Sequence, residues 1–88
     1  MFEFDPAKSI LNADKHGIDF DEAQALWRDE RRSVVSSNDK ASEVRQLVVG
    51  RIGDRIWTAI VTQRGDVVRI ISVRRARDRE IEVYERED

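Results

Sequence analysis

The pattern of hydrophobic and polar positions predicts a helical first third and a strand-rich second half. Residues 2–4, "FEF", suit a short strand, and Asp5-Pro6 supplies a helix cap followed by the residue favoured at the first helical position. We therefore expect a helix over residues 6–16, ended by Gly17 in a left-handed conformation. Its apolar side chains are expected to face the core: Ile10, Leu11 and either Ala7 or Ala13.

A second helix is predicted over residues 20–28, directly after this corner. Asp19 and Glu22 have the spacing of a capping box, and Ile18 and Ala23 can form a hydrophobic staple around it. One face of the helix carries its apolar residues: Phe20, Ala23, Leu26 and Trp27. Residues 33–35 can form a short strand, and residues 36–43 are rich in turn-forming residues.

Three strands are expected next, over residues 44–52, 55–63 and 67–74, because Val, Ile, Thr and Trp dominate these runs. Gly53-Asp54 and Gly65-Asp66 fit two-residue hairpin loops. Alternation through these loops places Arg64, Arg69 and Val73 on one face of the sheet, and Trp57 and Arg74 on the other. The tail can be read as a strand or a helix, and the helix is favoured because "ARDRE" is poor in strand formers.

These elements predict an α+β fold with a short N-terminal strand, two helices, an antiparallel β-meander and a C-terminal helix. A chain of 88 residues suits a single domain over residues 1–88. The chain has no cysteine, no signal-peptide pattern at its start and no apolar run long enough for a membrane span. A cytoplasmic location is therefore expected, with no membrane partner.

The net charge of −2 conceals a strongly basic block. Residues 45–79 carry nine arginines and no lysine, against three acidic side chains, and the flanking segments are acidic. Arginine presents a planar fork of donors that fits phosphate, so the block can bind a polyanion such as RNA. Ion pairs with the acidic tail are the structural alternative.

Two motifs, one within residues 5–23 and one within residues 64–84, together resemble those of the BrnT family of toxins, and the resemblance spans nearly the whole chain. The first motif comprises eight residues near the N-terminus: Asp5, Lys8, Asn12, Lys15, His16, Gly17, Phe20 and Ala23. The second comprises nine residues towards the C-terminus: Arg64, Gly65, Arg69, Ile71, Ser72, Arg74, Ala76, Glu80 and Tyr84.

The resemblance implies a RelE-like fold and a type II toxin that inhibits translation by cutting RNA. It also implies a BrnA-like antitoxin with a ribbon-helix-helix DNA-binding segment, in a heterotetramer that reaches operator DNA only through the antitoxin. The sequence offers no compact motif of metal ligands, so we expect a metal-independent endoribonuclease without a cofactor, in which the substrate 2′-hydroxyl is the nucleophile.

Arginines are expected to hold the scissile phosphate and other residues to move protons. Arg64 and Arg69 are the first candidates for the phosphate, with Arg74 or Arg75 beside them and Arg51 as a further phosphate contact. Glu80 and Tyr84 are candidates for proton transfer or for orienting these arginines. Lys15 and His16 form a second candidate group.

Each of these residues also has a structural interpretation. Glu80 can form an ion pair with Arg74 or Arg75, Tyr84 can be a core aromatic, and Lys15 and His16 can stabilise a helix end. The alternative function is a non-catalytic RNA- or protein-binding module that uses the same arginine-rich face, and a third is a structural partner of an acidic protein.

Overall fold

The computed structural model describes residues 1–37 and 44–86, and it confirms the α+β class. The predicted turn-rich segment lies mostly outside these residues. The elements are, in chain order, β1 (Phe2–Glu3), α1 (Pro6–His16), the 3₁₀ helix η1 (Glu22–Arg28), β2 (Ser33–Ser37), β3 (Arg45–Ile52), β4 (Arg55–Arg64), β5 (Val67–Arg75) and α2 (Asp78–Arg86). The helical reading of the tail is therefore correct.

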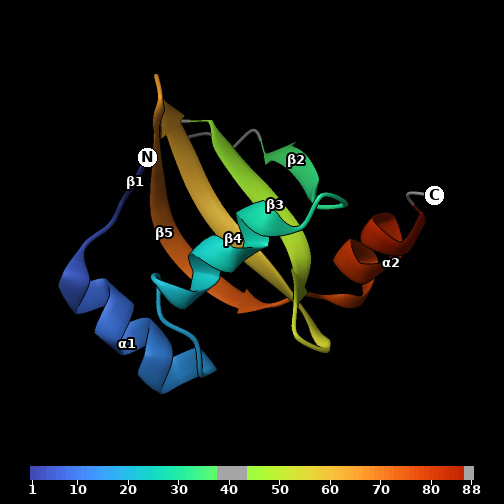
Figure 1. Cartoon of the computed structure of the whole chain (residues 1–88), viewed down its shortest axis with the longest axis horizontal. Coiled ribbons are helices and arrows are strands. Elements are labelled where there is room, and N and C mark those ends of the chain that lie inside the picture. Colours follow the sequence, from blue (N-terminus) through green and yellow to red (C-terminus); the bar gives the residue numbers. More distant parts are fainter. Residues whose placement is uncertain (38–43, 87–88) are drawn as a thin grey trace.

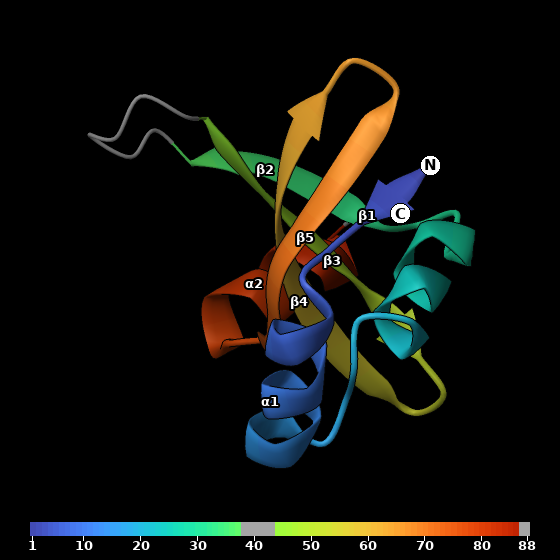
Figure 2. The same cartoon turned by 90° about the vertical axis from the view of Figure 1, so that its left-hand side faces the viewer.

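The five strands form one mixed sheet in the order β1-β5-β4-β3-β2 (Figure 1). β1 runs parallel to β5, and the other neighbours are antiparallel. Both predicted two-residue hairpins are present, and Gly53 and Gly65 take the positive φ values of 63° and 58° at their first positions. Figure 2 shows the sheet nearly edge-on, with η1 on one side, α2 on the other and α1 at the β5 edge.

The ends of α1 are as expected, but its buried face is not. Asp5 accepts a hydrogen bond from the Ala7 N–H, and Gly17 ends the helix with φ 79°. The inward prediction for Ile10 and Leu11 is wrong, because these side chains are 68% and 65% exposed. The helix instead packs through its polar side, with Ser9 and Asn12 buried. Of the two alanines, Ala13 is half-buried and Ala7 is exposed.

The polar side of α1 faces inward because its side chains form hydrogen bonds with buried backbone N–H and C=O groups. The Asn12 amide donates to the carbonyls of Ile18 (2.8 Å) and Val73 (2.9 Å) and accepts from the Val73 N–H (3.2 Å). The Ser9 hydroxyl accepts from the Phe20 N–H at 2.9 Å. Asn12 thus occupies the place of a neighbouring strand beside β5, where β1 no longer reaches.

The second helix is a 3₁₀ helix over Glu22–Arg28 rather than a helix from residue 20. The capping box is confirmed, since the Glu22 N–H donates to Asp19 Oδ1 at 2.7 Å and the Asp19 N–H to Glu22 Oε1 at 3.0 Å. The apolar residues of this segment join the core as predicted. They pack against one face of the sheet, and the buried residues of the core are Ile18, Phe20, Ala23, Leu26, Val48, Trp57, Ala59, Val61, Ile70 and Val73.

A β-bulge at Ile71 corrects the predicted faces of the sheet. Ile60 pairs with Ser72 but Val61 pairs with Ile70, so Ile71 has no partner on β4. The extra residue reverses the alternation beyond it. Val73 therefore lies with Ala59 in the core, and Arg74 lies opposite Thr58 on the face covered in part by α2. A bulge was not predicted, because it leaves the strand composition unchanged.

Candidate functional site

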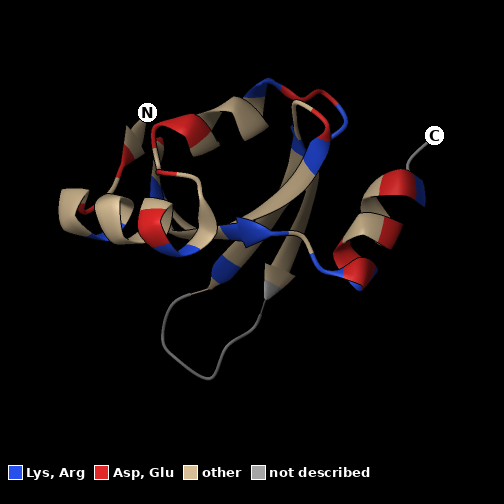
Figure 3. Ribbon diagram, turned by 90° about the horizontal axis from the view of Figure 1, so that it is seen from below, with Lys and Arg blue, Asp and Glu red and all other residues tan. Residues whose placement is uncertain are grey.

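The bulge places three arginines of the basic block on one face of the sheet. Arg69 pairs with Thr62 and Arg74 pairs with Thr58, and these two threonines share a face of β4 with Arg64. Arg69 and Arg74 are five positions apart, so without the bulge they would lie on opposite faces. Arg64 and Arg69 are diagonal neighbours across the hairpin, with Cα atoms ~7–8 Å apart. In Figure 3 basic positions lie on the strands, and acidic positions lie on α2 and on the helical N-terminal part of the chain.

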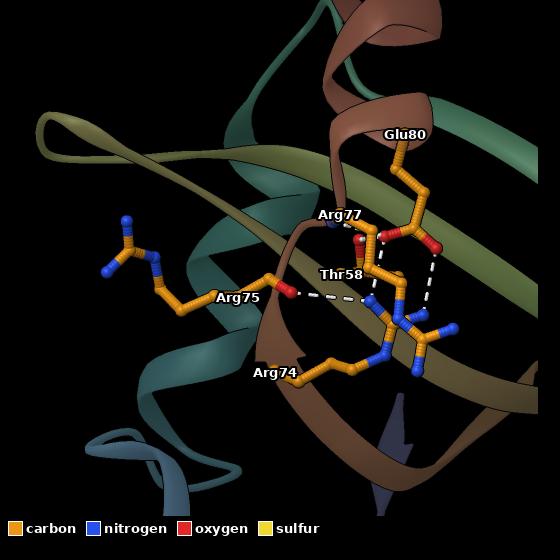
Figure 4. A network of polar contacts seen from close by, with 5 residues as sticks. All are labelled: Thr58, Arg74, Arg75, Arg77 and Glu80. Carbon is orange, nitrogen blue, oxygen red and sulfur yellow. Dashed lines mark hydrogen bonds and ion pairs between the residues drawn. The ribbon is translucent and has the colours of Figure 1, made fainter.

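Arg74 is fixed by a bidentate ion pair with Glu80 at the start of α2 (Figure 4). Both Nη atoms of Arg74 lie 2.8 Å from the Glu80 carboxylate oxygens, and the two side chains are only 18% and 16% exposed. The carboxylate also accepts from the Thr58 hydroxyl at 2.8 Å and the Arg77 N–H at 2.9 Å. Glu80 therefore holds one guanidinium in one orientation above the sheet.

The Arg74 guanidinium, with smaller contributions from the Arg77 N–H and the Thr58 hydroxyl, lowers the pKa of Glu80 to about 2 against the opposing effect of burial. A carboxyl with this pKa stays ionised near neutral pH and cannot supply a proton there. Of its two candidate tasks, the geometry favours orienting an arginine over transferring protons.

The Glu80 pKa predicts a loss of stability in acid. Because the folded-state pKa lies below the usual 4.5, the ion pair stabilises the fold fully above pH 4.5, and this contribution disappears as the pH falls towards 2. We expect a free-energy contribution of about 2–3 kcal/mol. Urea unfolding at several pH values should show this decline in the wild type relative to Glu80→Gln. Parallel curves for the two proteins would contradict the assignment.

Tyr84 connects α2 to the turn that precedes β2. Its hydroxyl donates to Asp29 Oδ2 at 2.5 Å, and the Asp29 carboxylate also accepts from the N–H groups of Arg51 (2.8 Å) and Arg31 (2.9 Å). Burial, the hydrogen bond to Asp29 and that carboxylate's charge raise the pKa of Tyr84. Burial raises the pKa of Asp29, but the hydrogen bonds from Tyr84, Arg51 and Arg31 outweigh it and leave that pKa below its usual value.

The Tyr84 hydroxyl therefore remains protonated near neutral pH, with its proton engaged by Asp29. Arg51 lies beside this pair and opposite Ile56 on β4, so it shares the sheet face of Arg74. A cleft of about 600 Å³ opens here, lined by Asp29, Arg31, Arg51, Gly53, Tyr84 and Glu85. The lining of this cleft includes Arg51 and Tyr84 but no arginine of β5.

Lys15 and His16 lie at the β5 edge, next to the bulge. A small cleft of about 190 Å³ there is lined by Lys8, Leu11, Asn12, Lys15, His16, Phe20, Ile71 and Ser72. Ser72 is two residues from Arg74 and opposite Ile60, on the same face of the sheet as the three arginines. The helix corner therefore brings Lys8, Lys15 and His16 to the side of the arginine-bearing face.

Arg75 lies on the opposite face from Arg74. Its guanidinium carbon is 5.6 Å from the centroid of the Trp57 ring, a cation–π contact. Arg69 forms an ion pair with Glu3 across the β1–β5 pair at 3.5 Å, with both side chains substantially exposed. Arg74 therefore shares a face of the sheet with Arg64 and Arg69, and Arg75 lies on the opposite face.

Thr58, Asp29 and Lys8 were not predicted as site residues, although all three contact or adjoin predicted ones. Lys8 had a detectable signal, since it belongs to the first motif and lies seven residues, or two helical turns, before Lys15. Asp29 and Thr58 had none, because their partners lie 55 and 22 residues away.

Within residues 1–37 and 44–86, no three His, Cys, Asp or Glu side chains converge as metal ligands. No helix in this part of the chain has both the length and the apolar character that a membrane crossing requires.

Comparison with known proteins agrees with the motifs. No curated protein matches the chain closely enough to serve as a relative. The family model of the ribonuclease toxin BrnT, of type II toxin–antitoxin systems, matches residues 4–80. These residues include both motifs up to Glu80, together with the bulged strand and its three arginines. The chain belongs to the BrnT family of ribonuclease toxins.

Proposed function

We propose that the chain is a metal-independent endoribonuclease whose reaction takes place over β5. The observation that carries this proposal is the alignment of Arg64, Arg69 and Arg74 on one face, with Arg74 held by Glu80. RNA cleavage through the 2′-hydroxyl builds negative charge on a phosphorane, and fixed guanidinium groups stabilise this charge without reorganising during the reaction. The RNA backbone would lie along β5 and contact these arginines in turn.

The proton transfers are assigned to the group at the β5 edge. A base removes the 2′-hydroxyl proton while the 2′-oxygen attacks phosphorus. An acid then protonates the departing 5′-oxygen, which leaves a 2′,3′-cyclic phosphate. Imidazole is the side chain best suited to such transfers near neutral pH. His16 is therefore the leading candidate and Lys15 its neighbour, whereas Glu80 and Tyr84 act as positioning residues.

The test of this proposal is RNA cleavage in EDTA by the purified chain. We expect wild-type protein to cut RNA with the metal chelated and to leave a 2′,3′-cyclic phosphate end. RNA with 2′-deoxyribose at the cleaved position should stay intact. His16→Gln should bind the same RNA and cut it about 100-fold more slowly, with an unchanged melting temperature.

The alternative, a non-catalytic RNA- or protein-binding module, makes the opposite prediction. It is supported by the engagement of Glu80 and Tyr84 in internal hydrogen bonds, which removes two of the four proton-transfer candidates. RNA that is bound with strong salt dependence but never cut would establish this alternative. A cleavage that requires Mg²⁺ would instead refute the metal-independent mechanism.

The wider biology follows from family membership and from the motifs. We propose that residues 1–88 form a single domain with a RelE-like fold and that RNA cleavage inhibits translation in the cytoplasm. We further propose that a BrnA-like antitoxin neutralises the chain in a heterotetramer, with its own ribbon-helix-helix segment bound to operator DNA. Growth arrest on induction, relieved by co-expression of the neighbouring antitoxin gene, would support this part.

A further inference from the structure

The β2 edge of the sheet is open and apolar in the described residues. β2 is the last strand of the sheet, and in this part of the chain it pairs only with β3. Val34 and Val35 point to opposite faces of the sheet, and they are 54% and 42% exposed. An exposed edge with valines on both sides is a ready template for one more strand.

A groove between β2 and α2 adjoins this edge. It consists of two hollows of about 380 and 300 Å³ that share the side chains of Val35 and Val83. Leu47 and Val49 of β3 line the hollow of about 300 Å³. The other hollow is lined in part by Ser33, which is 7% exposed and whose hydroxyl has no hydrogen-bond partner within residues 1–37 and 44–86.

The rim of this groove is basic. Arg31 and Arg32 line the first hollow, and Arg77 and Arg79 line the second. Glu30 and Glu80 are the acidic residues of the same lining, and Glu80 is already neutralised by its ion pair with Arg74. An apolar floor with a basic rim fits a protein segment that alternates apolar and acidic side chains. An RNA strand would pair with the arginines but would leave the valines without apolar partners.

We propose that this edge and groove bind an extended, acidic segment of the antitoxin. The segment adds a strand beside β2, inserts apolar side chains between Val35 and Val83 and places carboxylates against the rim arginines. The second hollow reaches Glu80, so the bound segment lies beside the group that holds Arg74. This inference rests on the proposed function, because it takes the antitoxin as the partner and the arginine face as the site that is neutralised.

The experiment measures binding between the chain and the protein encoded by the adjacent antitoxin gene, by isothermal titration calorimetry. Val35→Glu and Arg79→Glu should each weaken the affinity at least about 10-fold, because each places a negative charge where the segment carries its own. The control is Ile10→Glu, which places the same charge at an exposed apolar position on α1 away from the groove and should bind like the wild type. None of the three belongs to the proposed catalytic machinery, so all should cut RNA at the wild-type rate.

Hydrogen exchange on the unmodified complex gives a second readout that needs no variant to fold. Backbone amides within residues 33–37 should exchange more slowly once the antitoxin is bound. Wild-type affinity in both groove variants, or unchanged exchange in residues 33–37, would overturn the docking proposal and leave the ribonuclease intact. If Val35→Glu and Arg79→Glu lose RNA binding instead, the groove is an RNA surface and the proposal is wrong. If the wild-type chain does not bind the antitoxin, the antitoxin is not its partner, and this inference is wrong as well.

Discussion

The Arg74→Ala variant should cut RNA about 100- to 1,000-fold more slowly than the wild type. The position of Arg74 is fixed by its partner Glu80, whose carboxylate accepts four hydrogen bonds, two of them from Arg74. Removing a pre-positioned group that stabilises developing charge commonly costs this much in kcat. Glu80 keeps its hydrogen bonds from Thr58 and Arg77 in the variant, so the fold should survive for single-turnover assays.

Arg75→Ala is the matched control for this prediction. It removes the same side chain at the next position, but that side chain lies over Trp57 on the other face of the sheet. Its cleavage rate should stay within a few-fold of the wild type. Rapid cleavage by Arg74→Ala together with a loss in Arg75→Ala would mean that RNA binds the opposite face and that the site is placed wrongly.

Asn12→Ala should lower the free energy of unfolding by about 3 kcal/mol, although it deletes a polar side chain. The substitution removes three hydrogen bonds and leaves buried backbone groups of Val73 and Ile18 without partners. In a domain of this size, the melting temperature should fall by at least about 12 °C. Thermal unfolding followed by circular dichroism is sufficient to measure this.

Leu11→Ala is the comparison for Asn12→Ala. Leu11 is the neighbouring hydrophobic residue, and because it is 65% exposed its truncation should change the stability by no more than about 0.5 kcal/mol. Truncating a leucine to alanine ordinarily costs a helix more stability than truncating an asparagine, and here we expect the reverse. A larger loss in Leu11→Ala than in Asn12→Ala would contradict the role assigned to the polar face of α1.

Local signals in the sequence predicted the elements well. The bounds of α1 follow from its cap at Asp5 and its terminal Gly17, and both hairpins follow from a glycine at the turn. These features depend on residues a few positions apart. The inner face of α1 was predicted wrongly because the reason for it is distant: Asn12 serves the backbone of a strand 61 residues later.

The sequence identified residues of the candidate site but not which of them share a face of the sheet. Arg64, Arg69 and Glu80 were identified from motifs and charge, yet alternation alone placed Arg74 on the wrong face. One unpaired residue at Ile71 decides this, and nothing in a run of Val and Ile marks where a bulge occurs. The contact between Tyr84 and Asp29 was likewise invisible, because two single residues 55 positions apart leave no periodic pattern.

The parallel pairing of β1 with β5 has a consequence for the order in which the chain folds as it is synthesised. β1 is synthesised before its neighbour Val68, and Asn12 before its partner Val73, 61 residues later. The first helix and strand can therefore dock only after β5 has been synthesised. Glu80, which fixes Arg74, is translated later still. In the proposed site, the arginine face is therefore complete only after residue 80 has been synthesised, and a nascent chain shorter than this should not cut RNA.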